Sequence, residues 1–323
     1  MRVLVMGGTE FISLHLVWAL ARAGHAVTVF NRGRRRDRLP PGIDVITGDR
    51  KDHAGLRERL SAVRFEAVCD VTYAPTTGED VATLAEAVSP SRPHIVFVSS
   101  GRVHDHALPI PYDEATPRGE YWGEYARHKI AGEDALMQLH RERGLPVSIV
   151  RPTHVLGPLN TRNNETFFFD RILRGRPVLV PGHGGWLRQF GHAEDLADAM
   201  VQLLGNPKSF GQAYNVTGEE VVSQVGFVEL IGEVVERPVT LVHFDPRLLK
   251  GVERPGPVFG QNLVYDCHAV YTTWKIRTEL GFRPRYALAA GLRQTFEWYV
   301  KEGLDRRPVD FSFEETVLAR IRS

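Results

Sequence analysis

Short apolar runs recur through the first hundred residues, each separated from the next by a longer, more polar segment. The runs lie at 3–6, 26–30, 43–47, 66–71 and 94–99. Runs of this length, bounded by turn residues, are typical of buried strands, and the segments between them are long enough for helices. The alternation predicts an α/β fold with a doubly wound, parallel sheet and helices on both of its faces.

The segments between the runs show helical periodicity. After the first run, apolar residues recur at helical spacing from a start near Glu10. The other helices that the pattern predicts begin near Gly78 or cover about 119–143 and 195–204, and a further strand is expected at 213–216.

A glycine turn follows the first run. Gly7 and Gly8 come directly before the expected helix. Glycine adopts positive φ and has no Cβ to keep a ligand from the backbone, and a helix start points free N–H groups at an anion. Strand, glycine turn and helix in this order are typical of a pyrophosphate site for a dinucleotide, although plain turns have the same pattern. Glu10 and Ser13 replace the second and third glycines of the usual fingerprint, so the Glu10 carboxylate must turn to solvent if a pyrophosphate binds.

The end of the second run bears on the identity of the dinucleotide. An acidic residue here binds the ribose 2′-hydroxyl of NAD, whereas an arginine accommodates the 2′-phosphate of NADP. The chain has Asn31 and Arg32 at this point, with further arginines at 34–36. Arg32 favours NADP, although Asn31 is also able to bond a 2′-hydroxyl and 32–38 is equally explained as a solvated basic loop. Asp49, after the third run, is expected near the adenine.

Composition excludes several classes of protein. The 323 residues are 43% hydrophobic, which is enough for a sizeable core, and the formal net charge is +1. No overall field therefore favours nucleic acid or a membrane surface. Cys69 and Cys267 provide neither a disulfide framework nor a zinc spacing, and no apolar run has membrane-spanning length. We expect a cytoplasmic protein without a signal peptide or a metal site.

A hydroxyl pair and a tyrosine–lysine pair carry the candidate chemistry. Ser99 and Ser100 end the fifth run, where open α/β sheets bind ligands. Tyr125 and Lys129 lie four residues apart in an expected helix and so share one face. A tyrosine hydroxyl has an ordinary pKa of about 10, and a nearby ammonium favours its phenolate. Ser100, Tyr125 and Lys129 therefore form a candidate proton-transfer device beside a hydride acceptor.

These motifs, in this order, resemble the extended short-chain dehydrogenases/reductases of the NAD-dependent epimerase/dehydratase family. The segment Gly7-Gly-Thr-Glu-Phe-Ile-Ser13 is similar to the Gly-Gly-Thr-x-Phe-Ile-Gly motif of an atypical branch that includes the chloroplast stem-loop-binding proteins. The resemblance covers nearly the whole chain. It implies a Rossmann-type domain over 1–160, to which 189–218 returns, and a smaller C-terminal substrate-binding lobe over 161–188 and 219–323, with the site between them.

The resemblance also assigns roles to residues. Ser100, Tyr125 and Lys129 match the catalytic Ser/Thr, Tyr and Lys of the family. With the positions already named, the expected cofactor-binding residues are Gly7, Gly8, Thr9, Phe11, Ile12, Asn31, Arg32, Asp49, Arg50, Thr72, Ser99, Tyr125, Lys129, Pro152 and Thr153. The expected substrate-binding residues are Arg102, His154, Asn163, Asn164, Arg188 and Arg254.

The residues at several positions distinguish between subclasses of the family. In sugar-nucleotide 4,6-dehydratases an Asp-Glu pair follows the catalytic hydroxyl, whereas this chain has Gly101 and Arg102, so elimination of water is not expected. Arg188 and Arg254 lie in segments that resemble those binding the diphosphate in UDP-galactose 4-epimerase, and a guanidinium suits bidentate phosphate contact. Ordinary structural contacts explain either arginine equally well.

Other polar and aromatic features have plainer explanations. His104 stands where the family often has Tyr, and His104-Asp105-His106 is expected to be a polar loop rather than a metal site. Asn163 and Asn164 also suit a helix start. The aromatic residues 167–169 are expected to fill core between the two lobes.

Three functions follow from these expectations. The first is an NAD(P)-dependent epimerase or isomerase of a UDP- or dTDP-linked nucleotide sugar, which works by transient oxidation. The second is an NADPH-dependent carbonyl reductase of specialised metabolism. The third is an RNA-binding or scaffold protein on the same fold, for which the 32–38 loop is the support and against which the Tyr125–Lys129 pair argues. The resemblance also implies a homodimer that packs through the helix of Tyr125.

Overall fold

The computed structural model describes residues 1–71, 76–162, 164–250, 259–260 and 266–322. The chain divides into two compact units. The first consists of Met1–Val155, Gly191–Thr217 and Tyr271–Arg285, and the second of Leu156–Phe190, Gly218–Val270 and Tyr286–Ser323.

The first unit is built on a parallel sheet. Among the described residues this sheet has seven strands, in the order β10-β6-β5-β4-β1-β2-β3, and every neighbouring pair is parallel. The strands are β1 (Arg2–Met6), β2 (Ala26–Asn31), β3 (Asp44–Thr47), β4 (Ala67–Asp70), β5 (His94–Val98), β6 (Val147–Pro152) and β10 (Gln212–Val216). The predicted doubly wound parallel sheet is confirmed. Its order reverses between β1 and β4, the place where such sheets bind ligands.

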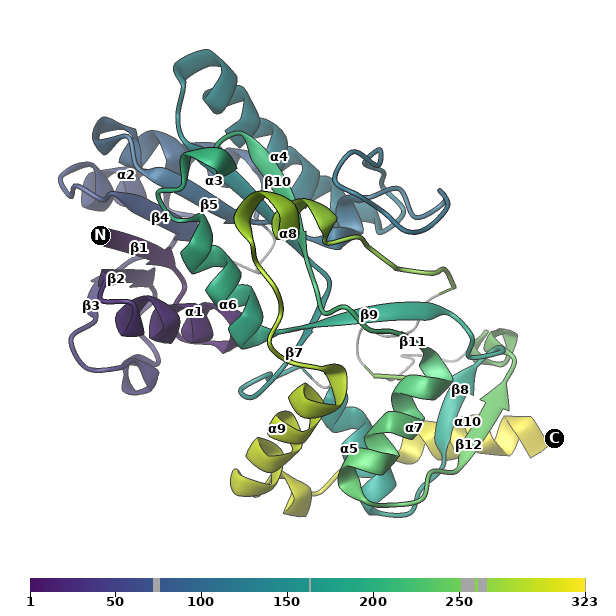
Figure 1. Ribbon diagram of the computed structural model, residues 1–323. Coiled ribbons are helices and arrows are strands. Elements are labelled where there is room, and N and C mark those ends of the chain that lie inside the picture. Colours follow the sequence, from purple (N-terminus) through teal and green to yellow (C-terminus); the bar gives the residue numbers. More distant parts are fainter. Residues whose placement is uncertain (72–75, 163, 251–258, 261–265, 323) are drawn as a thin grey trace. The chain divides into compact units, whose positions relative to one another are not determined.

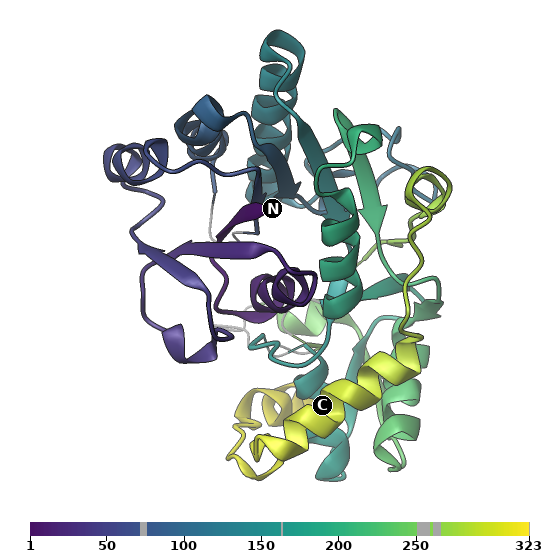
Figure 2. The ribbon, with the colours of Figure 1, turned by 60° about the vertical axis from the view of Figure 1, so that its left-hand side comes forward.

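Helices cover both faces of this sheet (Figure 1). Val3 and Val5 of β1 pack with α1 and α6 on one face, while Leu4 and Met6 pack with α2, α3 and α4 on the other. Figure 2 shows α1 and α6 side by side next to the sheet. The helices of this unit are α1 (Phe11–Arg22), α2 (His53–Ser61), α3 (Gly78–Val88), α4 (Gly123–Arg143), α6 (Ala193–Leu203) and α8 (Trp274–Leu280). β1 is apolar from Val3 to Met6 because both of its faces are buried there.

Two features of this unit differ from the expectation. The helix expected from about 119 begins at Gly123, because Gly119 N donates to the Val103 carbonyl and the chain turns before the helix starts. The segment Tyr271–Arg285, expected in the smaller lobe, belongs to the first unit. Ile276 and Phe282 are buried there against β6, β10 and α6. The short helix α8 lies far along the chain, and its few apolar residues do not indicate whether they join the core of the first unit or that of the second.

The second unit contains short strands and packed helices. Its elements are α5 (Glu165–Leu173), β8 (Val178–Pro181), β11 (Val221–Ser223), α7 (Gln224–Val235), β12 (Leu241–Phe244), α9 (Leu288–Lys301) and α10 (Ser312–Arg322), while β7 (His154–Leu156) and β9 (Leu187–His192) span the divisions of the chain. β8 and β12 pair in parallel, and β9 pairs with β11 in antiparallel. The 3-10 turns of the chain are η1 (Arg36–Arg38), η2 (Ser89–Ser91), η3 (Gly101–Val103), η4 (Pro207–Ser209), η5 (Pro246–Leu249) and η6 (Leu304–Arg306).

The aromatic run 167–169 lies in the core of the second unit. All three phenylalanines are fully buried, and Phe168 contacts Phe227 and Phe259 edge to face. Asp170, next in α5, receives the Tyr299 hydroxyl at 2.6 Å and the Arg307 guanidinium at 2.7 Å. These contacts fasten α5 to α9 and to the segment after η6.

A buried ion pair ties α4 to the sheet. The Arg151 guanidinium of β6 binds both oxygens of Glu133, with N···O distances of 2.9 and 2.7 Å. Burial alone disfavours the charged carboxylate, but Arg151 holds the pKa of Glu133 below its usual value. Both side chains are almost fully buried. Removal of the Glu133 charge would leave the buried Arg151 guanidinium without its carboxylate partner.

Glu133→Gln is expected to lower the free energy of unfolding by about 3 kcal/mol, because it leaves the Arg151 charge buried without a carboxylate. Urea unfolding of wild type and variant measures the difference. The matched control is Glu142→Gln, an exposed position of the same helix, for which we expect almost no change. Equal stability of Glu133→Gln and wild type would contradict this account of the pair.

Candidate functional site

The candidate site lies at the edge where the parallel strands of the first unit end. β1 leads into Gly7, β4 ends at Asp70, and β5 leads into Ser99 and Ser100. Parallel strands end at one edge, so residues far apart in sequence meet here.

The glycine turn after β1 requires its glycines. Gly7 and Gly8 have φ of +97° and +90°, and Phe11 has φ of +36°. A Cβ on Gly8 would lie 2.5 Å from Cγ1 of Val29, which leaves no room for a side chain. Thr9 and Ile12 complete the turn and the first residues of α1. The backbone therefore passes closely over β2, as a pyrophosphate cradle requires.

The two departures from the glycine fingerprint fit this cradle. The Glu10 carboxylate points to solvent and pairs with Arg35 at 3.1 Å, with both side chains about half exposed. The Ser13 hydroxyl donates to the Glu10 carbonyl at 2.7 Å and lies within ordinary contact distance of Gly7. The residues present are thus compatible with a bound pyrophosphate.

The end of β2 supports the same turn. Asn31 Nδ2 donates to the Gly7 carbonyl at 2.9 Å, and Asn31 Oδ1 accepts from Gly33 N at 2.7 Å. Arg32 is exposed, and the Arg36 guanidinium donates to the Thr47 hydroxyl at 2.8 Å. The Asn31 amide therefore fixes the loop, and Arg32 is the exposed side chain beside it.

A second buried ion pair lies at the end of β4. Arg50 binds both oxygens of Asp70 at 2.9 and 3.0 Å. Burial disfavours the Arg50 charge, but Asp70 raises the pKa of Arg50 overall. Contact of Arg50 with a cofactor stays a prediction, since its guanidinium is already bound to Asp70 in this structure.

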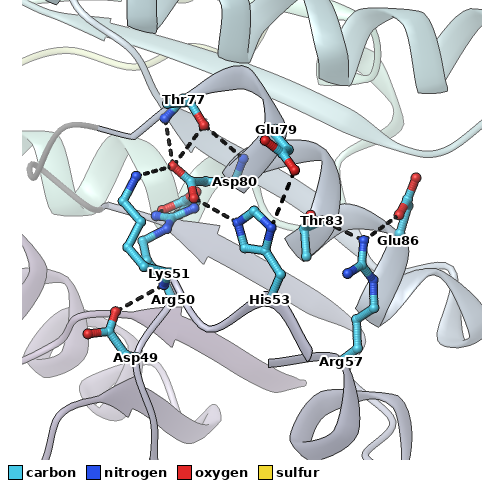
Figure 3. A network of polar contacts seen from close by, with 11 residues as sticks. Asp49, Arg50, Lys51, His53, Arg57, Thr77, Glu79, Asp80, Thr83 and Glu86 are labelled. Carbon is cyan, nitrogen blue, oxygen red and sulfur yellow. Dashed lines mark hydrogen bonds and ion pairs between the residues drawn. The ribbon is translucent and has the colours of Figure 1, made fainter. Parts of the chain in front are cut away.

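Figure 3 shows the polar network that holds this segment. The nearly buried Asp80 carboxylate receives Lys51 Nζ at 2.5 Å and Thr77 N at 2.7 Å, and it lies 2.9 Å from Nε2 of His53. Burial opposes ionisation, but these partners hold the pKa of Asp80 well below its usual range. Because Thr77 and Asp80 form the capping box of α3, the network joins α2 to α3. It thereby fixes the loop that carries Asp49, which is exposed.

Tyr125 and Lys129 lie one turn apart on α4. Lys129 is buried, and its ammonium donates to the Val98 carbonyl at 2.8 Å, at the end of β5. Burial lowers the pKa of Lys129 to about 8, a shift that the nearby Asp70 charge opposes. The Tyr125 ring is partly buried, with the Arg102 guanidinium 5.7 Å from its centre. The Ser100 hydroxyl accepts from Arg102 N at 3.2 Å.

An aromatic cluster borders this edge, and it corrects one expectation. His104 and His106 are buried, not part of a polar loop. His104 Nε2 lies 3.0 Å from Asn215 Oδ1, and His106 Nε2 lies 3.2 Å from the Tyr271 hydroxyl. A Cβ on Gly101 would lie 2.8 Å from the Tyr271 ring. The segment Tyr271–Arg285 supplies this ring from about 170 residues further along the chain, which is why no local pattern indicated it.

The remaining candidate residues follow β6 or belong to the second unit. Pro152 ends β6, the Thr153 hydroxyl lies 2.6 Å from that of Thr217, and His154 is partly buried. Arg188 is buried and donates to the Cys267 carbonyl at 2.6 Å. Asn164 is also buried, and its amide oxygen has no hydrogen-bond partner among the described residues. The predictions for Thr72, Asn163 and Arg254 lie outside the described residues.

Two contributors to this edge were not predicted from the sequence. Asp70 is a charged residue at the end of a buried strand, and that position was a usable signal. Trp122 has the Arg102 guanidinium 4.5 Å from its ring centre, a contact that no spacing rule indicates.

No group of three or more metal-ligating side chains occurs in the part of the chain that the structure describes. Among the same residues, no helix combines the length and apolar character needed to cross a membrane.

Known proteins resemble this chain over most of its length. The chain is 30% identical over 339 residues to the chloroplast stem-loop binding protein of 41 kDa b from Arabidopsis thaliana, a match that covers 99% of this chain and 84% of the relative. The UDP-glucose 4-epimerase of Thermotoga maritima, solved with UDP-glucose, superimposes with a TM-score of 0.79 at 21% identity and covers 94% of this chain and 99% of its own.

A second solved structure gives the same picture. The UDP-glucose 4-epimerase of Thermus thermophilus, in complex with NAD, has a TM-score of 0.74 at 22% identity, with 93% of this chain and 99% of that chain covered. At this identity the two structures establish the fold alone. The model of the NAD dependent epimerase/dehydratase family matches residues 3–217, which contain the glycine turn, Ser100, Tyr125 and Lys129. The chain therefore belongs to the NAD dependent epimerase/dehydratase family.

Proposed function

We propose that this protein is an NAD(P)-dependent epimerase of a nucleotide sugar. The observation that carries the proposal is the arrangement of Ser100, Tyr125 and Lys129 at the strand edge that also holds the glycine turn. The family and the fold of the UDP-glucose 4-epimerases support it. Gly7, Gly8 and Ser13 fit the pyrophosphate of a dinucleotide.

Tyr125 is the proposed proton acceptor. It takes the proton from a sugar hydroxyl as that carbon is oxidised to a ketone, and it returns the proton when the ketone is reduced on its other face. The bound dinucleotide supplies the hydride acceptor in the first half of the cycle and the hydride donor in the second. Ser100 bonds the same substrate oxygen and holds it against Tyr125.

Lys129 supplies a fixed positive charge. With a pKa of about 8 in its buried position, its ammonium is mostly protonated at neutral pH. Lys129 lies one turn from Tyr125 on the same face of α4. The hydrogen bond to the Val98 carbonyl holds the ammonium in place.

Two buried residues of the second unit are proposed to bind substrate. Arg188 is a buried cation on β9 that suits a diphosphate, and the amide oxygen of Asn164 is a buried acceptor for a sugar hydroxyl. The UDP-glucose bound to the Thermotoga maritima protein supports a nucleotide sugar as the ligand class. Elimination of water is not proposed, because Gly101 and Arg102 stand where the 4,6-dehydratases have a carboxylate pair.

A net NADPH-dependent carbonyl reductase is the second candidate. The observation that favours it is the end of β2, where Arg32 is exposed and both ends of the Asn31 amide are bonded to the main chain. An exposed arginine at this point suits the 2′-phosphate of NADP. The two candidates differ in whether the dinucleotide is regenerated in each cycle or consumed.

Tyr125→Phe is expected to reduce turnover by at least about 100-fold, because it removes the proton acceptor. The assay follows epimerisation by NMR over a panel of UDP- and dTDP-linked hexoses and hexuronates. Dinucleotide binding should persist in the variant. Tyr121→Phe, in the turn before α4, is the matched control and should retain activity. A fully active Tyr125→Phe protein would overturn the mechanism.

The buried Lys129 ammonium predicts a pH-dependent stability. Its pKa is about 8 when folded, against an ordinary 10.5, so the unfolded chain holds the proton over a range where the folded chain has released it. The free energy of unfolding of wild type, minus that of Lys129→Met, should therefore rise between about pH 8 and pH 10.5. This difference should be lowest below about pH 8. Urea unfolding of the ligand-free proteins measures it. A constant difference across this range would contradict the low pKa.

Release of bound dinucleotide separates the candidate functions. Denaturation of the purified protein, followed by chromatography, should yield near-stoichiometric NAD⁺ or NADP⁺ if each cycle regenerates the cofactor. A protein that purifies without dinucleotide and then consumes NADPH would instead support the reductase. If no dinucleotide binds, and stem-loop RNA binds with steep salt dependence, the RNA-binding hypothesis takes their place.

A further inference from the structure

We propose that Arg102 binds a carboxylate on the sugar, so that the preferred substrate is a nucleotide-linked uronic acid. This proposal rests on the proposed function, because it assigns the substrate class of the same site. It concerns the first unit alone.

The position of Arg102 puts its charge beside the reacting groups. It is the second residue after Ser100, and its backbone N donates to the Ser100 hydroxyl at 3.2 Å. Its guanidinium lies 4.5 Å from the ring centre of Trp122 and 5.7 Å from that of Tyr125. Contact with two rings limits the rotation of the guanidinium, and an oriented planar fork suits bidentate contact with a carboxylate.

Two buried carboxylates near this edge, Glu133 and Asp70, have cationic partners. Glu133 is bound by Arg151 and also lies 3.2 Å from Arg118, while Asp70 is bound by Arg50. The Lys129 ammonium adds a further positive charge among the proposed reacting groups. An anionic group on the substrate would therefore enter a region of positive potential.

The chemistry of hexoses identifies that group. In a uronic acid the exocyclic carbon of the nucleotide-linked sugar is a carboxylate, whereas in other hexoses it is a neutral group such as hydroxymethyl. When the reacting hydroxyl is on the neighbouring ring carbon, three bonds of about 1.5 Å separate its oxygen from the carboxylate carbon. Such a carboxylate would lie next to the oxygen that Tyr125 deprotonates. The Arg102 guanidinium, 5.7 Å from the centre of the Tyr125 ring, would then be within reach of it. A neutral hydroxymethyl group offers no matching charge.

The test compares sugars that differ at this one carbon. UDP-glucuronate and UDP-glucose, and the corresponding dTDP pair, are titrated by calorimetry into dinucleotide-loaded wild type, Arg102→Gln and Arg102→Lys. Arg127→Gln is the matched control, because Arg127 is an exposed arginine of α4 that pairs with Glu120. Circular dichroism and melting curves verify that each variant is folded.

Wild type should bind the glucuronate more tightly than the glucose with the same nucleotide. Arg102→Gln should weaken binding of the glucuronate by about 10- to 100-fold, the range for loss of a charged hydrogen-bonded partner, and leave that of the glucose unchanged. The affinity of Arg102→Lys for the glucuronate should lie between those of wild type and Arg102→Gln. Arg127→Gln should bind both sugars as wild type does.

Equal or tighter binding of the glucose by wild type would overturn the proposal, as would an Arg102→Gln effect of the same size on both sugars. In either case the epimerase proposal survives, since a nucleotide sugar still binds. Binding of neither sugar with either nucleotide would overturn both.

Discussion

The buried ammonium of Lys129 is the constraint on which this site depends. A cation in the protein interior needs a fixed polar partner, and the Val98 carbonyl provides it at 2.8 Å. Residues 125, 129 and 133 lie one turn apart on one face of α4, so the same face presents Tyr125, binds β5 through Lys129 and binds β6 through Glu133. The contacts of Lys129 and Glu133 with the sheet thus fix which face of α4 packs on it, and with it the position of Tyr125.

The glycine turn shows how a departure from a motif is accommodated. A carboxylate at position 10 would repel a pyrophosphate if it faced the turn. It faces solvent instead and pairs with Arg35, while Ser13 is small enough to lie against Gly7. Whether such a turn accepts a pyrophosphate therefore depends on where its side chains point, and the sequence alone does not give that direction.

Charge compensation also shapes the remainder of the edge. Arg50 and Asp70 form one buried pair, and the network around Asp80 holds the helices beside it. Asp70 and Arg50 act in opposite directions on the pKa of Lys129, which Asp70 raises and Arg50 lowers. The Arg102 guanidinium lies at the same edge, 4.5 Å from the ring centre of Trp122 and 5.7 Å from that of Tyr125.

The sequence by itself determined the α/β class, the parallel strands from β1 to β5 and the helix that carries Tyr125 and Lys129. These features rest on local patterns: apolar runs, glycines and a spacing of four residues. Only the tertiary structure decided the outward direction of Glu10, the engagement of Arg50 by Asp70 and the burial of His104 and His106. It also decided that Tyr271–Arg285 joins the first unit, where the Tyr271 ring fills the space beside Gly101. The physical reason is that partners distant in the chain set the direction and surroundings of a side chain, and no periodicity within a segment encodes those partners.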